Sequence, residues 1–197
     1  MSYEAVVIGA SAGGLDALKT IFSALPADFP LPVIVVLHLH RDTKEELINF
    51  LNVGTRLKVK YAEDKEKIKN CTIYIAPPDY HLLIEDDKTL SLSVDALVNY
   101  SRPSIDVLFE CAADVFREHC FGIILTGANS DGSGGLKRIK EKGGMAIVQN
   151  PHSAEYSAMP TAAIAVTDVD YILDIEEIAG KIMELVRMSV YAKHINS

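Results

Sequence analysis

The sequence contains little of several residue types, and each shortage excludes a class of protein. Basic residues are outnumbered by acidic ones, 19 to 27, and the net charge of −8 offers no basic surface to a nucleic acid. The longest apolar run, near residues 32–37, is far shorter than the roughly 18 residues of a membrane span. The three cysteines lack a CxxC spacing, so they indicate neither a disulfide framework nor a zinc site. We expect all three, Cys71, Cys111 and Cys120, to be small buried apolar residues.

The chain also lacks a secretory signal and an internal linker. Its first residues include Glu4 but no basic segment, and only a short apolar run follows. With 197 residues, 49% of them hydrophobic and 23% charged, the composition is that of an ordinary globular protein. We therefore expect a single cytoplasmic domain over residues 1–197, without insertion into a membrane.

Short β-branched runs alternate with stretches of helical periodicity along the chain. Buried strands are expected near residues 5–8, 32–37, 72–76, 121–125, 145–148 and 171–173, with an antiparallel hairpin over 81–94. Helices are expected near 15–25, after a Thr43 cap with Glu46 at the capping-box position, from Pro103 onward, over 134–142 and from 175. This alternation predicts an α/β protein with three α/β/α layers around a doubly wound, mainly parallel sheet. Ligands and catalytic groups of such sheets gather at the carboxyl ends of the strands.

The first expected strand ends in a glycine-rich turn, Gly9-Ala-Ser-Ala-Gly-Gly14, with a helix directly after it. The turn satisfies G-x-S-x-G in the strand–turn–helix context of a nucleophile elbow, so Ser11 is a candidate nucleophile. Backbone N–H groups at the start of the helix would lie beside its hydroxyl and stabilise an oxyanion. The alternative is a phosphate-binding loop with a structural serine, but neither G-x-G-x-x-G nor G-x-x-x-x-G-K-[ST] matches.

Two further strand ends supply partners for Ser11. His38 follows the second strand and would act as the general base. A metal site built on His38 and His40 lacks a third ligand at a suitable spacing. Asp131, in a polar glycine-rich loop after residues 121–125, would orient the histidine, unless it caps the next helix instead. Other acidic residues are expected on a helix away from these strand ends: Asp106, Glu110 and Asp114.

The chain order serine, histidine, aspartate disfavours an α/β-hydrolase, in which the acid precedes the histidine. The sequence instead resembles the catalytic domain of the chemotaxis protein-glutamate methylesterases, the CheB family. The resemblance extends from residue 8 to about 185 and rests on several motifs in the right order. They are Ile8-Gly-Ala-Ser-Ala-Gly-Gly14, the strand end at His38, Ala62-Glu-Asp64, Tyr74-Ile-Ala-Pro77, Arg102-Pro-Ser-Ile-Asp-Val-Leu-Phe109, Gly122-Ile-Ile-Leu-Thr-Gly127, Asp131-Gly132, Gln149-Asn150 and Met159-Pro160.

This resemblance implies which residues carry the chemistry. It implies a catalytic triad of Ser11, His38 and Asp131, and an oxyanion hole formed by the backbone N–H groups of Ala12 and Ala128. The family usually has serine or threonine at the position of Ala12 and methionine at that of Ala128. Alanine keeps the N–H group but loses side-chain contacts, which would lower the rate. Leu37 stands where a glutamine often precedes the histidine.

The resemblance also implies an activity and partners. The activity is that of a serine hydrolase that demethylates γ-glutamyl methyl esters on the cytoplasmic helices of chemoreceptors and also deamidates glutamines, without a metal or an organic cofactor. Fuller members of the family carry an N-terminal receiver domain. Here the first expected strand begins only a few residues after Met1, so we expect no receiver, and regulation that is absent or supplied by a separate receiver protein. Two alternatives stay open: an esterase or amidase for another protein, and a catalytically silent binding module of the same fold.

Overall fold

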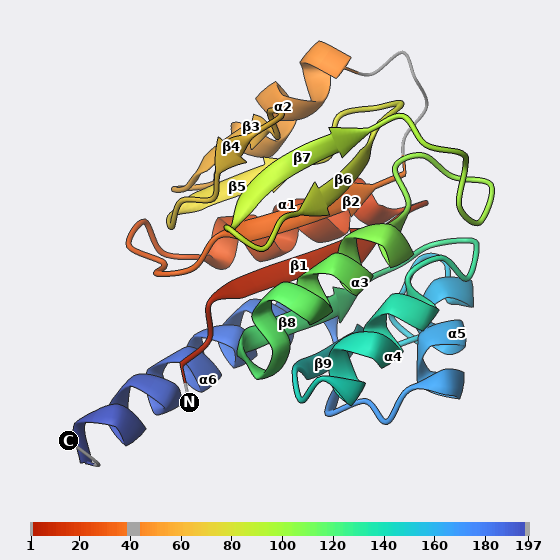
Figure 1. Cartoon of the computed structure of the whole chain (residues 1–197). Coiled ribbons are helices and arrows are strands. Elements are labelled where there is room, and N and C mark those ends of the chain that lie inside the picture. The colour runs from red at the N-terminus through yellow and green to blue at the C-terminus, as the bar shows by residue number, and fades with distance from the viewer. Residues whose placement is uncertain (1, 39–43, 196–197) are drawn as a thin grey trace.

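The computed structural model describes residues 2–38 and 44–195 of the protein (Figure 1). Parallel strands form the central sheet in the order β10-β9-β8-β1-β2-β5-β3. They are β1 (Ala5–Ala10), β2 (Val33–Leu37), β3 (Lys58–Tyr61), β5 (Thr72–Ile75), β8 (Cys120–Ile124), β9 (Met145–Gln149) and β10 (Tyr171–Leu173). A smaller antiparallel sheet contains β4 (Glu66–Lys67), β7 (Thr89–Ser93) and β6 (His81–Ile84). The predicted α/β class, with a parallel sheet and an antiparallel hairpin, is confirmed.

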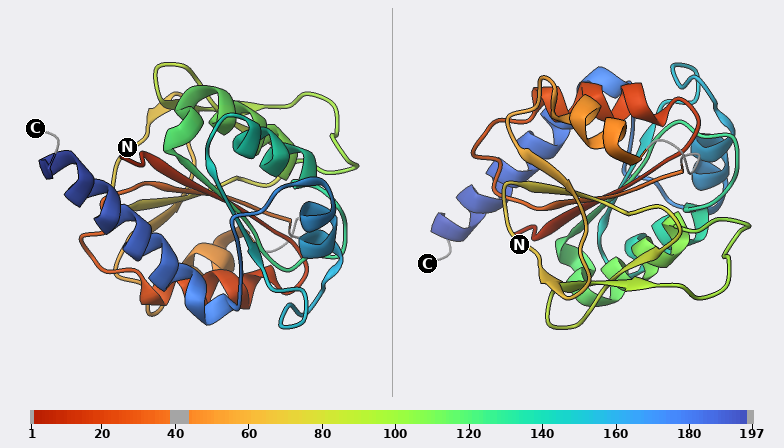
Figure 2. Two further views of the ribbon diagram at one scale, coloured as in Figure 1. Left: turned by 90° about the horizontal axis from the view of Figure 1, so that it is seen from below. Right: turned by 90° about the horizontal axis from the view of Figure 1, so that it is seen from above.

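Helices cover both faces of the large sheet and produce the layers seen in Figure 2. One face carries α1 (Gly14–Ala24), α2 (Lys44–Asn52) and α6 (Ile175–Ile195), and the other carries α3 (Ile105–Phe116), α4 (Ser133–Glu141) and α5 (Ala158–Val166). Successive side chains of a strand point to opposite faces, so Val6 and Ile8 join the core under α1 and α6, whereas Val7 joins the core under α3 and α4. Burial on both faces explains why β1 is apolar without interruption. Within the described ranges, no helix is long and apolar enough to cross a membrane.

Several local expectations differ from the structure. The strand β3 was not predicted, because it lies at the edge of the sheet and exposes Lys58. The helix α5 was not predicted either; its sequence is small and apolar, and Pro160 lies in its first turn, where the missing N–H costs little. Pro103 does not open α3, which begins two residues later after Ser104. Cys71 is exposed, so the expectation that it is buried was wrong. The predicted Thr43 cap lies outside the described residues.

The strand order determines where a site can form. The chain leaves β1 through α1 on one face of the sheet and leaves β8 through α4 on the other face. Such a switch point between neighbouring parallel strands opens a crevice at their carboxyl ends. Ser11 follows β1, His38 follows β2, and residues 126–131 follow β8, so all three segments reach the same edge of the sheet.

Candidate active site

Ser11 lies in a tight turn between β1 and α1. The turn is closed by a hydrogen bond of 2.8 Å from the Gly14 N–H to the Ser11 carbonyl, and the Ser11 N–H donates to the Thr126 carbonyl at 3.0 Å. Gly13 has a left-handed φ of 73°, and a Cβ atom there would lie 2.6 Å from Glu155 Oε2. Only glycine fits this position without strain. The serine is therefore fixed between two strand ends, as the elbow motif predicted.

The sheet register brings His38 next to Ser11. Ala10 pairs with Leu37, and the His38 N–H donates to the Ala10 carbonyl at 3.0 Å. On its other side, β1 pairs with β8. The loop after β8 approaches Ser11 through Gly127, where a Cβ atom would lie only 3.0 Å from the Ser11 Cβ. Glycine at that position allows the loop after β8 to close over the serine.

Asp131 is the most constrained member of the cluster and is only 1% exposed. Its Oδ1 accepts hydrogen bonds from Asn99 Nδ2 at 2.8 Å and from Ser104 Oγ at 2.8 Å. Its Oδ2 accepts the Ile105 N–H at 2.6 Å and lies 3.1 Å from His38 Nε2. The carboxylate thus sits against the N-terminus of α3, where backbone N–H groups and the helix dipole favour a negative charge.

These contacts control the charge of Asp131. Burial alone would raise the pKa of its carboxyl group, but hydrogen bonds from His38, Asn99, the Ile105 N–H and Ser104 outweigh it and lower the pKa to about 2. The carboxylate is therefore ionised throughout the range in which a histidine titrates. Asp106, whose carboxylate shares the Asn99 amide, behaves differently, because burial and the nearby charge of Asp131 raise its pKa.

The contacts of His38 also assign its tautomer. An ionised carboxylate can only accept a hydrogen bond, so Asp131 at 3.1 Å places the ring proton on Nε2, although the N–H is not aimed squarely at the oxygen. The Nδ1 atom is then the basic nitrogen. It lies 3.3 Å from Asn129 Nδ2, and the orientation of this amide is fixed by the bond of 3.1 Å between its Oδ1 and the Asp131 N–H. Among the described residues, no hydrogen bond joins the ring to Ser11, as is common in enzymes without bound substrate.

Sequence reasoning found part of this cluster and missed the rest. The structure brings together Ser11, His38 and Asp131, whereas His40 lies outside the described residues. The alternative that Asp131 caps the next helix is wrong for α4, whose N-cap is Gly132 without a side-chain bond, but Asp131 does cap α3 from outside. The expectation that Asp106 lies away from the site was also wrong. The residues that were missed are Asn99, Ser104, Thr126 and Asn129.

The expected oxyanion-hole residues flank the serine. Ala12 directly follows Ser11, and its carbonyl accepts a bond of 3.0 Å from Thr126 Oγ1, which ties the elbow to the loop after β8. Ala128 is exposed in that same loop. The hydrogen bonds found among the described residues leave the N–H groups of both alanines without an acceptor, so both are available to a ligand. No three metal-binding side chains converge within the described ranges.

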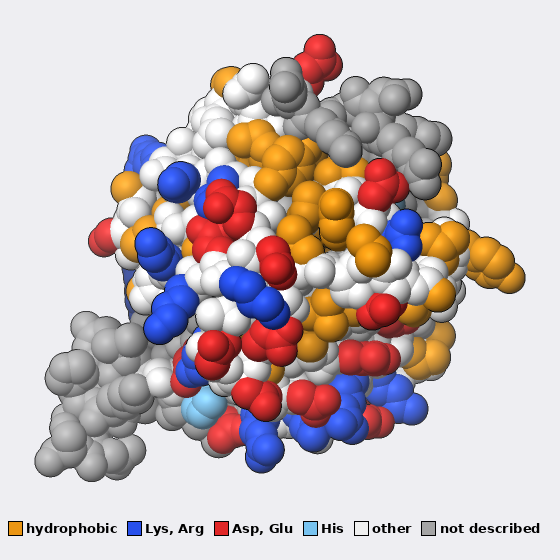
Figure 3. Space-filling view, turned by 45° about the horizontal axis from the view of Figure 1, so that its top comes forward, with side chains coloured by type: hydrophobic (Ala, Val, Ile, Leu, Met, Phe, Trp, Pro, Cys, Tyr) orange, Lys and Arg blue, Asp and Glu red, His pale blue; other side chains and the backbone are white. Residues whose placement is uncertain are grey.

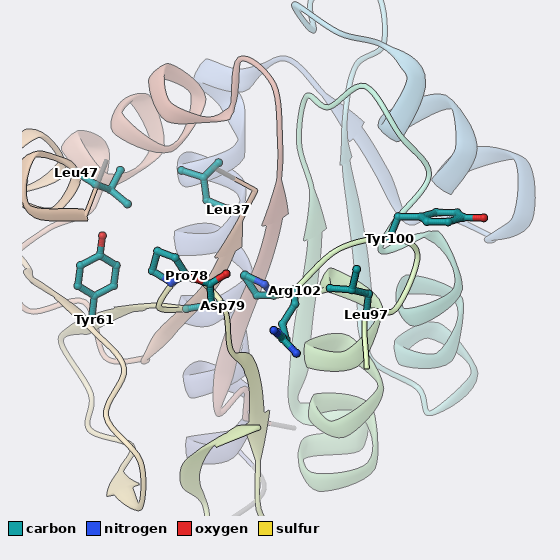
Figure 4. Close-up of a pocket in the computed structure, with 10 residues that line it drawn as sticks. Leu37, Leu47, Tyr61, Pro78, Asp79, Leu97, Tyr100 and Arg102 are labelled. Carbon is teal, nitrogen blue, oxygen red and sulfur yellow. The ribbon is translucent and has the colours of Figure 1, made fainter. Parts of the chain in front are cut away.

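A cavity of about 190 Å³ adjoins the cluster (Figure 4). Leu37, which precedes His38, contributes to its wall together with Pro78 and Leu97, and Arg102 adds a polar group. In Figure 4, Tyr100 extends away from the other labelled side chains. Figure 3 shows one face of the molecule, with hydrophobic side chains gathered in the upper middle of the view and charged side chains over its lower part.

A serine at a strand–helix turn, with a histidine and a buried carboxylate from neighbouring strand ends, is the arrangement that defines the class of serine hydrolases. Comparison with known proteins narrows this class. The family model described as CheB methylesterase matches residues 6–182. The chain therefore belongs to the CheB methylesterase family.

Individual relatives agree with this assignment. A Leptospira interrogans protein, provisionally named a protein-glutamate methylesterase/protein-glutamine glutaminase, is 52% identical over 94% of this chain and 96% of its own length. The enzyme of that name from Clostridium acetobutylicum is 34% identical, and the match covers 94% of this chain but 54% of the relative, so the chain spans about half the length of such relatives. The crystal structure of the Thermotoga maritima CheB methylesterase catalytic domain, 34% identical, superimposes with a TM-score of 0.90 over 94% of this chain and 100% of that one.

Proposed function

We propose that the protein is a serine hydrolase that cleaves methyl esters of protein glutamate side chains, with Ser11 as nucleophile, His38 as general base and Asp131 as the residue that orients His38. The observation that carries this proposal is the contact of 3.1 Å between Asp131 Oδ2 and His38 Nε2, made by a carboxylate whose pKa is lowered to about 2. A carboxylate that is ionised at neutral pH and contacts Nε2 stabilises the imidazolium that forms when His38 takes a proton. The names of the relatives supply the substrate class.

The first half of the reaction forms an acyl-enzyme. His38 Nδ1 exchanges its contact of 3.3 Å with Asn129 Nδ2 for the Ser11 hydroxyl, and takes the hydroxyl proton while Ser11 Oγ attacks the ester carbonyl carbon. The oxyanion of the tetrahedral intermediate accepts the N–H groups of Ala12 and Ala128. When the intermediate collapses, the C–O bond to the methoxy group breaks and His38 returns its proton to this leaving group. Methanol departs and the glutamyl chain remains esterified to Ser11.

The second half repeats the same steps with water. His38 Nδ1 removes a proton from water, whose oxygen attacks the acyl carbon, and Ser11 leaves with the proton that His38 returns. The products are a free glutamate carboxyl group and the original enzyme. A glutamine side chain follows the same route with ammonia as leaving group, which is harder to expel than methanol.

The surface beside the site fits a macromolecular substrate. Val94 is 67% exposed, Leu97 57% and Tyr100 98%, so the loop before α3 presents apolar side chains to solvent next to the cavity. Large apolar side chains that one loop exposes to solvent are typical of surfaces that contact another protein. We assign them to contacts with the cytoplasmic helices of chemoreceptors, and we propose accordingly that the protein acts in the cytoplasm.

Replacing the nucleophile tests the proposal. Ser11→Ala should lower methanol release from methylated receptor by on the order of 10³-fold or more, because only binding and the oxyanion hole remain. Labelling by a serine-reactive phosphonate should disappear in the same variant. Methanol release near the wild-type rate from Ser11→Ala would overturn the assignment, and labelling without receptor demethylation would point to another ester substrate.

A further inference from the structure

The loop between β7 and α3 contains a tight turn that carries a side chain into the catalytic cluster. Val98 and Ser101 pair across the turn through hydrogen bonds of 3.2 and 2.9 Å between their backbones. The two residues between them, Asn99 and Tyr100, have left-handed φ values of 51° and 61°, as in a type I′ turn. Asparagine tolerates this conformation well, and here the conformation directs its amide inward.

The amide of Asn99 joins two carboxylates. Its Nδ2 lies 2.8 Å from Asp131 Oδ1 and 2.7 Å from Asp106 Oδ2. A primary amide has two N–H donors, so each carboxylate receives one of them. No role in the reaction described above requires Asn99 to touch substrate, and its two bonds end on residues behind His38.

These bonds determine which oxygen of Asp131 faces the histidine. Asn99 and Ser104 both donate to Oδ1, whereas Oδ2 receives the Ile105 N–H and faces His38 Nε2 at 3.1 Å. Rotation of the carboxylate would break the bonds to both oxygens together, so the bonds to Oδ1 help to keep Oδ2 directed at the histidine. The same amide also lies between two negative charges that would otherwise face each other directly.

We propose that Asn99 is a positioning residue for the catalytic carboxylate: its amide holds Asp131 Oδ1 and Asp106 together, so that Asp131 Oδ2 stays directed at His38 Nε2. The inference rests on the proposed role of Asp131 in the triad. It makes the side chain of Asn99 part of the support for the catalytic carboxylate, although Asn99 does not touch the reacting atoms.

Asn99→Gly is the sharpest test, because glycine removes the amide and still adopts the left-handed φ. We expect kcat for a small carboxylic ester to fall by about 10- to 100-fold with little change in KM, the scale expected when a catalytic group is slightly misplaced. Ser101→Gly is the matched control: it removes a side chain from the same turn whose hydroxyl, among the residues that the structure describes, donates to the Asn99 carbonyl at 3.4 Å and to neither carboxylate. The control should retain the wild-type kcat.

Asn99→Asp supplies a readout that a purely structural role would not change. Aspartate keeps the size and the tolerance for a left-handed φ, but when ionised it cannot donate and faces Asp131 and Asp106, with Glu110 near both. The basic groups of this region include His38, which contacts Asp131, and Arg102, whose guanidinium bonds the Val94 and Asp95 carbonyls. Protonated, it can still donate one hydrogen bond. The deficit in kcat relative to the wild type should therefore grow as pH rises, whereas the deficit of Asn99→Gly should not depend on pH.

Nitrogen-15 NMR of labelled histidine tests the geometry without turnover. The wild type should show His38 as the Nε2–H tautomer, and Asn99→Gly should show a mixture or a shifted Nε2 resonance. His81 serves as the internal reference, because its Nε2 bonds the Ala96 carbonyl at 3.0 Å and its Nδ1 accepts the Ser104 N–H at 3.2 Å. An unchanged His81 signal shows that the loop remains folded in the variant.

The outcomes separate this inference from the proposed function. If the wild type turns over, Ser11→Ala does not, and Asn99→Gly equals Ser101→Gly in kcat and in the His38 spectrum, the inference is wrong while the function stands. If neither the wild type nor any variant hydrolyses ester or reacts with phosphonate, the function fails, and the His38 spectra of Asn99→Gly and Ser101→Gly still decide whether Asn99 positions Asp131. Should Asn99→Gly not fold, the pH dependence of Asn99→Asp decides.

Discussion

Asp131 and Asp106 bind the same amide nitrogen of Asn99, and burial raises the pKa of both, yet their pKa values end on opposite sides of the ordinary value of 3.8. Asp131 reaches about 2 because His38, Asn99, the Ile105 N–H and Ser104 stabilise its charged form. Asp106 stays raised because the Gly135 N–H and Asn99 do not offset its burial and the neighbouring charge of Asp131. The number of donors and a basic partner therefore decide whether the effect of burial on the pKa of each carboxyl group is outweighed.

The difference follows from where each residue sits relative to α3. Asp131 approaches the N-terminus of the helix from outside and accepts backbone N–H groups on both oxygens. Asp106 belongs to the first turn of that helix and accepts the Gly135 N–H at 2.6 Å from α4. Of the two carboxylates, only that of Asp131 contacts His38. The fold therefore favours the ionised form more strongly at the carboxylate that the proposed reaction needs.

The largest expected effect comes from neutralising Asp131. Asp131→Asn should lower kcat by about 10⁴-fold, the scale of the same exchange in serine-protease triads. An amide has an acceptor oxygen on one side only, so either His38 and the Ile105 N–H, which share Oδ2, or Asn99 and Ser104, which share Oδ1, lose their acceptor. Asparagine also lacks the negative charge that holds the ring proton on Nε2. Steady-state kinetics of ester hydrolysis measure the loss. A decrease of tenfold or less would show that His38 does not depend on this carboxylate.

A smaller effect is expected on the stability of the fold at acid pH, where the wild type and Asp131→Asn should become more alike. The pKa of Asp131 is depressed from 3.8 to about 2, so its ionised form stabilises the fold above pH 4, and this contribution disappears as pH falls from about 4 to 2. The shift corresponds to about 2 kcal/mol. The difference in free energy of unfolding between the wild type and Asp131→Asn should therefore shrink by about that amount over this range, measured by denaturant titration. A difference that is constant with pH would contradict the lowered pKa.

The outline of the fold was predictable from the sequence because burial leaves a local signal. The strands β1 and β2 are apolar without interruption, as buried parallel strands are, and the first helix shows a clear periodicity. The Ser11 turn was predictable for a related reason, since Gly13 must adopt a left-handed φ and lies close to Glu155. His38 and Asp131 followed from the rule that catalytic groups gather at strand ends.

The residues around the proposed triad could not be predicted in the same way. Asn99 is 32 residues from Asp131 in sequence, and a single asparagine in a loop carries no signal of its partner. Asn129 lies within the loop that was singled out, but the direction of its amide depends on a bond to the Asp131 N–H that only the folded loop reveals. The position of Asp106 was misjudged because helical periodicity says which face is buried but not which loop packs against the end of the helix.

The smallest effect is expected from Asp106→Asn, which tests the other half of the comparison between Asp131 and Asp106. Asp106→Asn removes a carboxyl group whose pKa is raised in the folded protein. In the wild type, this group binds a proton more tightly in the folded state than in the unfolded state, so the stability of the wild type falls as pH rises above about 4. The stability of the variant does not fall with pH in this way. At neutral pH this gain compensates for the weaker hydrogen bond that asparagine at this position would make with Asn99. We expect its kcat to stay within about fivefold of the wild type, because Asp106 does not contact His38, an effect of about 1 kcal/mol. Its stability relative to the wild type should be better at pH 7 than at pH 4, measured by denaturant unfolding at both values. A relative stability that is worse at pH 7 would mean that the Asp106 charge stabilises the fold, and the contrast between the two carboxylates would fail.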